Sequence, residues 1–257
     1  MTAILETRQL TKTFGAVTAA NSLDVSVEAG SVVGLIGGNG AGKTTFINLV
    51  TGYLKPTLGT VHFDGKDITG VPPRRITRLG LCRSFQIPQV FDSLTAYENV
   101  LTGLGVVALG RRAFVGSSLG DRRPEEVAEE MLRRFRLDGY RDDRAATLPE
   151  GVRKLLDIAM ALVVKPRILL LDEPTSGVSA DEKFALMDLV LEAIRADGVT
   201  VLFVEHDMEV VRRYVGRVLA FYEGRIIADG LPAEVLAHPE VRRLVVGEGH
   251  QGEEAAC

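Results

Sequence analysis

A glycine-rich stretch that ends in lysine and threonine is the part of this 257-residue chain with the clearest capacity for chemistry. Residues 37–44 read Gly-Gly-Asn-Gly-Ala-Gly-Lys-Thr and match the pattern G-x-x-x-x-G-K-[ST]. Glycines let the backbone aim its N–H groups at phosphate oxygens, and a helix expected from about Gly42 to Leu49 adds the positive end of its dipole. The stretch therefore predicts a site that holds the phosphates of a nucleotide.

The residue types within this loop indicate their roles. Backbone contacts to phosphate are expected from Gly37, Gly38, Asn39, Gly40, Ala41 and Gly42. We expect Lys43 to reach the β- and γ-phosphates and the Thr44 hydroxyl to be a ligand of Mg²⁺. Thr45 could add a hydrogen bond to an α-phosphate oxygen. A glycine-rich turn with a chance lysine is disfavoured, because a buried strand at residues 31–36 leads into the loop and a helix follows it.

Two acids at the end of an apolar run are the second candidate. The run Ile168–Leu171 predicts a strand, and Asp172 and Glu173 follow it. Ligands of open α/β sheets bind at the carboxyl ends of strands, where these acids would lie. We expect Asp172 to orient the shell of Mg²⁺ through water, and Glu173 to position or deprotonate the water that attacks the γ-phosphate. The alternative is that the pair caps a helix expected at 181–196.

The elements that must position these residues predict an α/β fold. Strands are expected at 23–27, 31–36, 59–65, 168–171 and 200–204, with a closing hairpin of 217–222 and 225–227. Alternating strands and helices favour a mostly parallel sheet, to which the early strands add an antiparallel part. Residues 87–165 have a helical pattern, amphipathic at 126–135 and more apolar at 152–164, and a helical tail is expected at about 231–257.

Composition limits the class of protein. With 46% hydrophobic residues the chain can bury a large core, and a net charge of −4 argues against a nucleic-acid partner. Two cysteines, Cys82 and Cys257, are too few for a disulfide framework and favour a reducing, cytosolic compartment. The start lacks the apolar core of a signal peptide, and the longest uncharged run, residues 100–110, is too short to span a bilayer. We therefore expect any membrane role to require a partner.

Further residues, in this order and spacing, resemble the ATP-binding cassette family over nearly the whole chain. Phe14 stands where such cassettes place a ring against adenine, although a core phenylalanine is the alternative. Gln86 resembles the glutamine that reaches Mg²⁺ and senses the γ-phosphate. His206 matches the histidine that contacts the γ-phosphate and helps to hold the attacking water. The resemblance implies an ATPase with the P-loop NTPase core, one domain over residues 1–257 and a helical subdomain at about 87–165.

One motif departs from the family. Cassettes usually carry a Leu-Ser-Gly-Gly-Gln-like sequence that acts in trans on ATP held by a second cassette, whereas this chain has Leu-Pro-Glu-Gly-Val at 148–152. Pro149 offers no hydroxyl and Glu150 adds negative charge, so only Gly151 remains as a backbone donor in trans. This departure predicts a heterodimer with a second cassette whose motif is intact. Ser179 has either an inter-subunit role or forms a capping box with Glu182.

Within the family, residues 83–91, the long Arg-containing insertion around 110–123 and residues 204–208 together resemble the ATP-binding subunit of branched-chain amino acid importers. This resemblance implies a second cassette, two membrane-spanning permease subunits, an extracytoplasmic solute-binding protein and a peripheral place on the cytoplasmic face of the inner membrane. Residues 87–91 would line the groove for a permease helix, or form subdomain core. Amides, urea and aromatic acids remain open as solutes.

Three other classes are alternatives to this interpretation. A lipopolysaccharide-export cassette is similar in sequence, but its homodimer would need a working trans motif. A soluble ABC ATPase acting on ribosomes or DNA would carry two cassettes or long coiled coils, and the chain has no heptads. A P-loop kinase or GTPase would not explain Gln86, His206 and the helical subdomain together.

Overall fold

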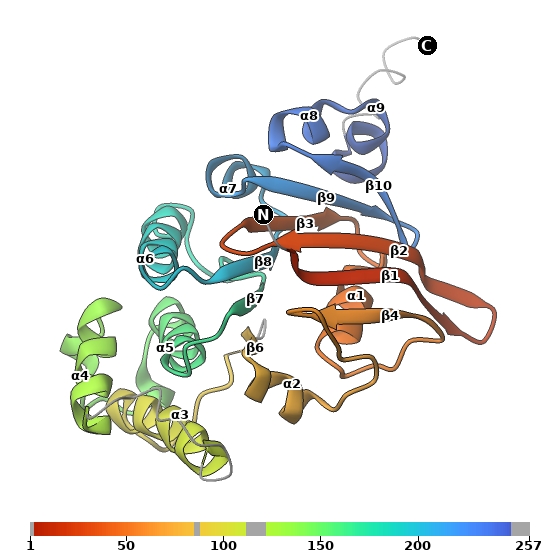
Figure 1. Ribbon diagram of the computed structural model, residues 1–257. Coiled ribbons are helices and arrows are strands. Elements are labelled where there is room, and N and C mark those ends of the chain that lie inside the picture. The colour runs from red at the N-terminus through yellow and green to blue at the C-terminus, as the bar shows by residue number, and fades with distance from the viewer. Residues whose placement is uncertain (1–2, 85–87, 112–121, 248–257) are drawn as a thin grey trace, which may run out of the picture. The chain divides into compact units, whose positions relative to one another are not determined.

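The computed structural model describes residues 3–84, 88–111 and 122–247, which are coloured in Figure 1. The chain divides into two compact units. The first consists of Met1–Ile76 and Thr200–Cys257, and the second is Thr77–Val199. The second unit is therefore an insertion in the sequence of the first.

The first unit contains an antiparallel sheet with the strand order β2-β1-β4-β5. Its strands are β1 (Ala3–Phe14), β2 (Val17–Glu28), β4 (Leu58–Phe63) and β5 (Lys66–Asp67). In β2, Leu23, Val25 and Val27 are buried and the residues between them are exposed, as expected for a strand with one face against a core. The predicted strands at 23–27 and 59–65 lie in β2 and β4, whereas β1 was not predicted.

The first unit also carries a mostly parallel sheet with the strand order β10-β9-β3-β8. Strand β3 (Val32–Gly37) pairs in parallel with β8 (Thr200–Val204) on one side and with β9 (Arg217–Tyr222) on the other, and β10 (Arg225–Gly230) is antiparallel to β9. Strands β3 and β8 are nearly continuous apolar runs because both of their faces are buried. The helices assigned with this unit are α1 (Lys43–Val50), α7 (Met208–Tyr214), α8 (Pro232–Ala237), α9 (Pro239–Val241) and the π-helical turn η3 (Arg242–Val246).

The second unit pairs β6 (Leu81–Ser84) in parallel with β7 (Ile168–Asp172). Its helices are α3 (Ala96–Arg111), α4 (Pro124–Arg134), α5 (Glu150–Val163) and α6 (Lys183–Ala196), with short 3₁₀ turns η1 (Asp138–Tyr140) and η2 (Ala145–Thr147). Helix α2 (Pro73–Leu79) spans the boundary of the two units. Helices α3, α4 and α5 pack on one another, and α5 also contacts α6 and β6. Leu132, Phe135 and Leu156 are fully buried in this unit.

Several expectations about elements need correction or lie outside the described residues. The helix predicted at 181–196 begins at Lys183, and the one predicted at 152–164 begins at Glu150. Gln86 and Cys257 are outside the described residues, whereas Cys82 is buried, which raises the pKa of its thiol to about 12. No helix among residues 3–84, 88–111 and 122–247 is long and apolar enough to cross a membrane. The single-domain scheme with a helical subdomain at 87–165 stays a prediction.

Candidate nucleotide site

The glycine-rich loop follows β3 and runs into α1, as predicted. Close neighbours require glycine at both of its ends. A Cβ on Gly37 would lie 2.5 Å from the Phe221 carbonyl oxygen, and one on Gly42, whose φ is 106°, would lie 2.7 Å from the Ala19 carbonyl oxygen. The loop is thus fitted between β2 and β9 of its own unit, which fixes where its N–H groups lie.

Lys43 is held inside the loop. Its side chain is buried, and Nζ donates hydrogen bonds to the carbonyl oxygens of Gly37 at 2.6 Å and Gly38 at 3.0 Å. The N-cap of α1 is Gly42, which has no side chain. No side-chain cap bond is therefore made to the first N–H groups of this helix, next to the loop. Thr44 is exposed and Thr45 half-buried at the start of α1. A buried cation beside a helix amino end suits phosphate.

The hairpin of β9 and β10 supports the glycine-rich loop by hydrogen-bonding to its backbone. The Gly224 N–H donates to the Ala41 carbonyl at 2.9 Å, and the Gly224 carbonyl accepts from the Asn21 N–H at 2.8 Å. The rings of Phe46 and Phe221 lie 5.7 Å apart between α1 and β9. These contacts fix the position of the loop relative to two strands of its own unit.

Phe14 lies at the end of β1, and 48% of its surface is exposed. The alternative of a core phenylalanine is therefore wrong. Lys12 Nζ lies 5.1 Å from the centre of the ring, which adds a cation–π contact. The exposed ring is available for stacking on a base.

His206 lies two residues after the end of β8 and is exposed. Its position is fixed on both sides, because its N–H donates to the buried Glu205 carboxylate at 3.2 Å and the Asp207 carboxylate caps α7. Since β3 and β8 are parallel neighbours, their carboxyl ends lie at the same edge of the sheet. The structure therefore brings His206 and the phosphate-binding loop to one edge of the first unit.

The two predicted acids lie in the second unit at the end of β7. Asp172 accepts from Arg83 of β6, with Nη2 and Oδ2 2.6 Å apart, and the two side chains are only 9% and 12% exposed. The role of Arg83 was not predicted. The alternative that the acids cap α6 is wrong, because the N-cap of α6 is Glu182. Glu173 has a left-handed backbone with φ of 51°, which is uncommon for a residue with a side chain.

Gln86 itself lies outside the described residues, but both flanks of its segment are fixed by Asp157 of α5. Asp157 Oδ2 accepts from the Ser84 hydroxyl at 2.5 Å, and Oδ1 accepts from the Gln89 N–H at 2.9 Å. Asp157 is buried and was not singled out from the sequence. Asp157 lies inside a helix and its partners are on distant segments, so no local sequence pattern reveals its role.

The degenerate trans motif forms the start of α5. Pro149 is the N-cap and makes no side-chain cap bond, and α5 begins at Glu150. The Glu150 carboxylate contacts Gly177 in the loop that follows β7, and Gly151 is half-buried beside Val178. The first turn of α5 thus packs against a loop of its own unit.

The capping box predicted for Ser179 does not form. Its hydroxyl donates to the Glu182 carboxylate at 2.8 Å, and the helix begins later, with Glu182 as a cap that makes no side-chain bond. The predicted pair therefore interacts through its side chains, and the first N–H group of α6, that of Lys183, donates to the Ser179 carbonyl at 3.0 Å.

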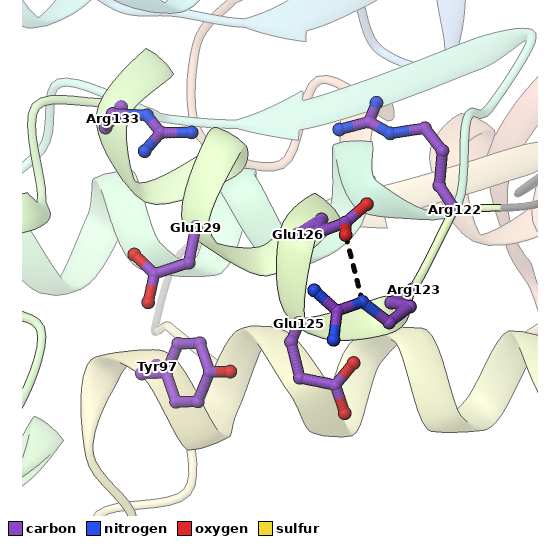
Figure 2. A pocket seen from close by; sticks show the side chains of 7 residues that line it. All are labelled: Tyr97, Arg122, Arg123, Glu125, Glu126, Glu129 and Arg133. Atoms are coloured by element: carbon purple, nitrogen blue, oxygen red, sulfur yellow. Dashed lines mark hydrogen bonds and ion pairs between the residues drawn. The ribbon is translucent and has the colours of Figure 1, made fainter.

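A surface hollow of about 370 Å³ lies on the helices of the second unit (Figure 2). Tyr97, Arg122, Arg123, Glu125, Glu126, Glu129 and Arg133 line it. Its charges largely pair within the protein: Arg123 Nε lies 2.9 Å from a Glu126 oxygen, and Glu129 binds Arg141 at the same distance. None of the predicted nucleotide-binding residues is in this hollow.

The oxygen donors of the chain suit Mg²⁺ bound together with a nucleotide. The Thr44 hydroxyl is exposed in the first unit, and Asp172 is half-buried in the second. In the described part of the chain, no group of three or more His, Cys, Asp or Glu residues could hold a metal alone. Mg²⁺ is usually bound by one or two protein oxygens and substrate phosphates, so each of these donors is of a type that fits.

A glycine-rich loop between a central parallel strand and a helix, with a buried lysine inside it, defines a nucleotide-binding protein of the P-loop α/β class. The sequence model of the ABC transporter family matches residues 20–176. The chain is 36% identical to a probable branched-chain amino acid transport ATP-binding protein LivG from Archaeoglobus fulgidus, over 99% of this chain and 98% of that protein. It is 35% identical to the high-affinity branched-chain amino acid transport ATP-binding protein BraF from Pseudomonas aeruginosa, over 95% and 98%.

Solved structures agree with the sequences. The ADP conformation of MJ1267, an ATP-binding cassette of an ABC transporter, has a TM-score of 0.82 at 33% identity, covering 95% of this chain and 98% of that one. The cassette MJ0796, in a post-hydrolysis dimer bound to ADP and Pi, has a TM-score of 0.74 at 25% identity, covering 89% and 98%. The chain belongs to the ABC transporter family. The predicted family, fold class and ATPase activity are confirmed, and the chain is a nucleotide-binding subunit of a transporter.

Proposed function

We propose that this chain hydrolyses ATP to drive an importer of branched-chain amino acids or related small polar solutes. The observation that carries the proposal is the braced phosphate-binding loop with Lys43 buried in it. The solute class is supported by relatives that are 35% and 36% identical over nearly their full length and are described as branched-chain amino acid transport proteins. The solute itself would be selected by other subunits.

In this proposal ATP lies along the loop, with the adenine on Phe14 and the phosphates against Lys43 and the N–H groups of α1. Thr44, Gln86 and, through water, Asp172 would hold Mg²⁺, which would neutralise charge at the phosphate oxygens. Glu173 orients the attacking water or accepts its proton, and His206 holds that water against the γ-phosphate. Phosphoryl transfer needs mainly such positioning and charge stabilisation.

The second cassette is proposed to differ from this one. The family's trans motif begins a helix with a hydroxyl and two glycines, whereas α5 starts with Pro149, Glu150 and Gly151. Gly151 would be the one motif residue left to donate a backbone N–H in trans. ATP on this chain would then be hydrolysed with the intact motif of a partner cassette, and the opposite site would be slower.

Two permease subunits and an extracytoplasmic solute-binding protein would complete the importer, with this chain peripheral on the cytoplasmic face of the inner membrane. Phe91, in the segment predicted to meet a permease helix, is 49% exposed. Its backbone is held by the fully buried Asn99, whose side chain accepts from the Phe91 N–H at 2.7 Å and donates to its carbonyl at 3.1 Å. An apolar side chain presented on a fixed backbone supports this docking role.

The first experiment measures Mg²⁺-dependent ATP hydrolysis by the purified chain, before and after addition of the cassette encoded beside it. We expect activity to require the partner and to be lost with Glu173→Gln. Strong cooperative activity of the chain alone would show that residues 148–152 work in trans, and would favour the homodimer of an export-type cassette.

The asymmetry of the two sites is tested in the assembled pair. We expect Glu173→Gln to abolish most turnover, because it disables the site that has an intact trans motif, while the equivalent substitution in the partner has a smaller effect. Equal losses from the two substitutions would rule out the asymmetric dimer.

A further inference from the structure

Helix α5 carries two buried charged side chains one turn apart, Lys154 and Asp157, which are 4% and 7% exposed. Charged groups are rarely buried unless specific partners satisfy them. Apolar residues would fill the same helix face at lower cost. The partners of these two side chains therefore indicate what the charges do.

Lys154 holds the backbone at Glu173. Its Nζ donates to the Glu173 carbonyl oxygen at 3.2 Å and to the Ser176 carbonyl oxygen. Glu173 has a φ of 51°, a strained conformation for a residue with a side chain, and such strain persists only where surrounding contacts impose it. Because the backbone dihedral angles of Glu173 relate this carbonyl to its Cβ, a cation that holds the carbonyl also restricts the direction of the Glu173 side chain.

The same helix contacts the far end of this loop. A Cβ added to Gly177, which has a φ of 74°, would clash with the Glu150 carboxylate, and one added to Gly151 would lie 4.0 Å from a Val178 methyl group. Helix α5 thus holds the loop from Glu173 to Val178 at both ends. Lys154 hydrogen-bonds to its start, and the first turn of α5 packs against its end. Asp157 adds the bonds to Ser84 and Gln89 on either side of residues 85–87.

We propose that Lys154 is a positioning residue for hydrolysis: its buried ammonium holds the left-handed peptide of Glu173, so that this carboxylate points at the attacking water. The inference rests on the role proposed above for Glu173. Lys154 contacts backbone carbonyls and has no part in the chemistry itself. Lys154 connects two parts of the second unit. One is α5, whose first turn is the motif proposed to act in trans, and the other is the loop that begins at Glu173, the proposed base of this chain's own site.

The test is a double-mutant cycle in the two-cassette assembly with Lys154→Met and Glu173→Gln. Lys154→Met is expected to lower kcat roughly 10- to 100-fold with KM for ATP changed less than about threefold, because a displacement of about 1 Å suffices for such a loss. In the double variant Lys154→Met should add no further loss to that of Glu173→Gln. Lys154→Arg, which keeps a buried donor, should recover most of the turnover.

Arg153→Met is the matched control. It removes a positive charge from the neighbouring position of α5, where the side chain pairs with Asp92 at 2.7 Å, and it should leave kcat unchanged.

Losses that multiply in the double variant, or a KM that rises with kcat unchanged, would overturn the positioning role. If Glu173→Gln alone left turnover intact, the proposed role of Glu173 would fail instead. Should Lys154→Met not fold, Lys154→Gln replaces it in the same cycle, with the same two outcomes.

Discussion

Glycines of the phosphate-binding loop are not equivalent at the level of single residues. A Cβ on Gly37 would clash with the Phe221 carbonyl at 2.5 Å, whereas a Cβ on Gly38 meets nothing within 4 Å. We expect Gly37→Ala to lower the free energy of unfolding by about 1–3 kcal/mol through overpacking. Gly38→Ala should stay within about 1 kcal/mol of the parent. Urea unfolding measures both, and equal stability of the two variants would contradict the close approach of β9.

The ion pair of Arg83 and Asp172 provides a second prediction. Arg83→Met leaves a mostly buried carboxylate without this cation, and breaking one side of such a pair usually costs about 3–5 kcal/mol. Arg123→Met removes the same type of charge from an exposed pair with Glu126 and should not change stability measurably. If both variants unfold at the same urea concentration, the Arg83 pair is not formed in solution.

Single residues could be predicted from the sequence where a local motif contains them. Lys43, Thr44 and the two acids at the end of β7 are predicted in this way, because each belongs to a short recognisable pattern that follows or ends an apolar strand. Arg83 and Asp157 were missed. Their partners lie 89 and 73 residues away in the chain, so only the three-dimensional structure brings them together.

Among the elements, α7 offers a test of how His206 is placed. Asp207 Oδ1 accepts from the N–H groups of Glu209 at 2.9 Å and Val210 at 3.3 Å, which caps the helix immediately after His206. Asp207→Ala should lower the free energy of unfolding by about 1 kcal/mol, and Asp207→Asn, which keeps an acceptor, by less. Thermal or urea unfolding measures the difference. Identical losses for the two variants would show that the cap does not contribute.

Element prediction succeeded where burial is uniform and failed where strands are irregular. Strand β8 agrees with its predicted range of 200–204 because all five of its residues are buried and suited to a strand. Strand β1 was not predicted because its pairing with β2 has register shifts between Thr7 and Leu10 and between Leu10 and Lys12, which break the alternation of apolar and polar residues. The start of α6 was placed two residues early because Ser179 pairs with a side chain instead of capping the helix.

For the whole molecule, the division into two units could not be read from local patterns. A helical character marks residues 87–165, but the second unit also contains β6, β7 and α6, and strand pairing decides their place. The spacing of apolar residues along the chain indicates which segments are helical, but it gives no information about which strands are neighbours in a sheet.

The division of the chain predicts how a fragment would behave. Residues 1–199 contain the entire glycine-rich loop but lack β8 and β9, the two strands that pair with β3. We expect this fragment not to bind a fluorescent ATP analogue, whereas the full chain does, because the loop has lost Phe221 and Gly224 behind it. Equal affinity of fragment and full chain would show that the loop needs no bracing.

The same arrangement dictates an order of events during translation. Strand β3 leaves the ribosome early, but its neighbours β8 and β9 are made only after the whole inserted unit has been synthesised. Contacts between such distant segments form late and slowly, so the apolar strand must wait in a nascent chain that is prone to association. The protein therefore becomes able to bind nucleotide only near the end of its synthesis. A ribosome stalled before residue 200 would hold a chain that cannot yet bind ATP.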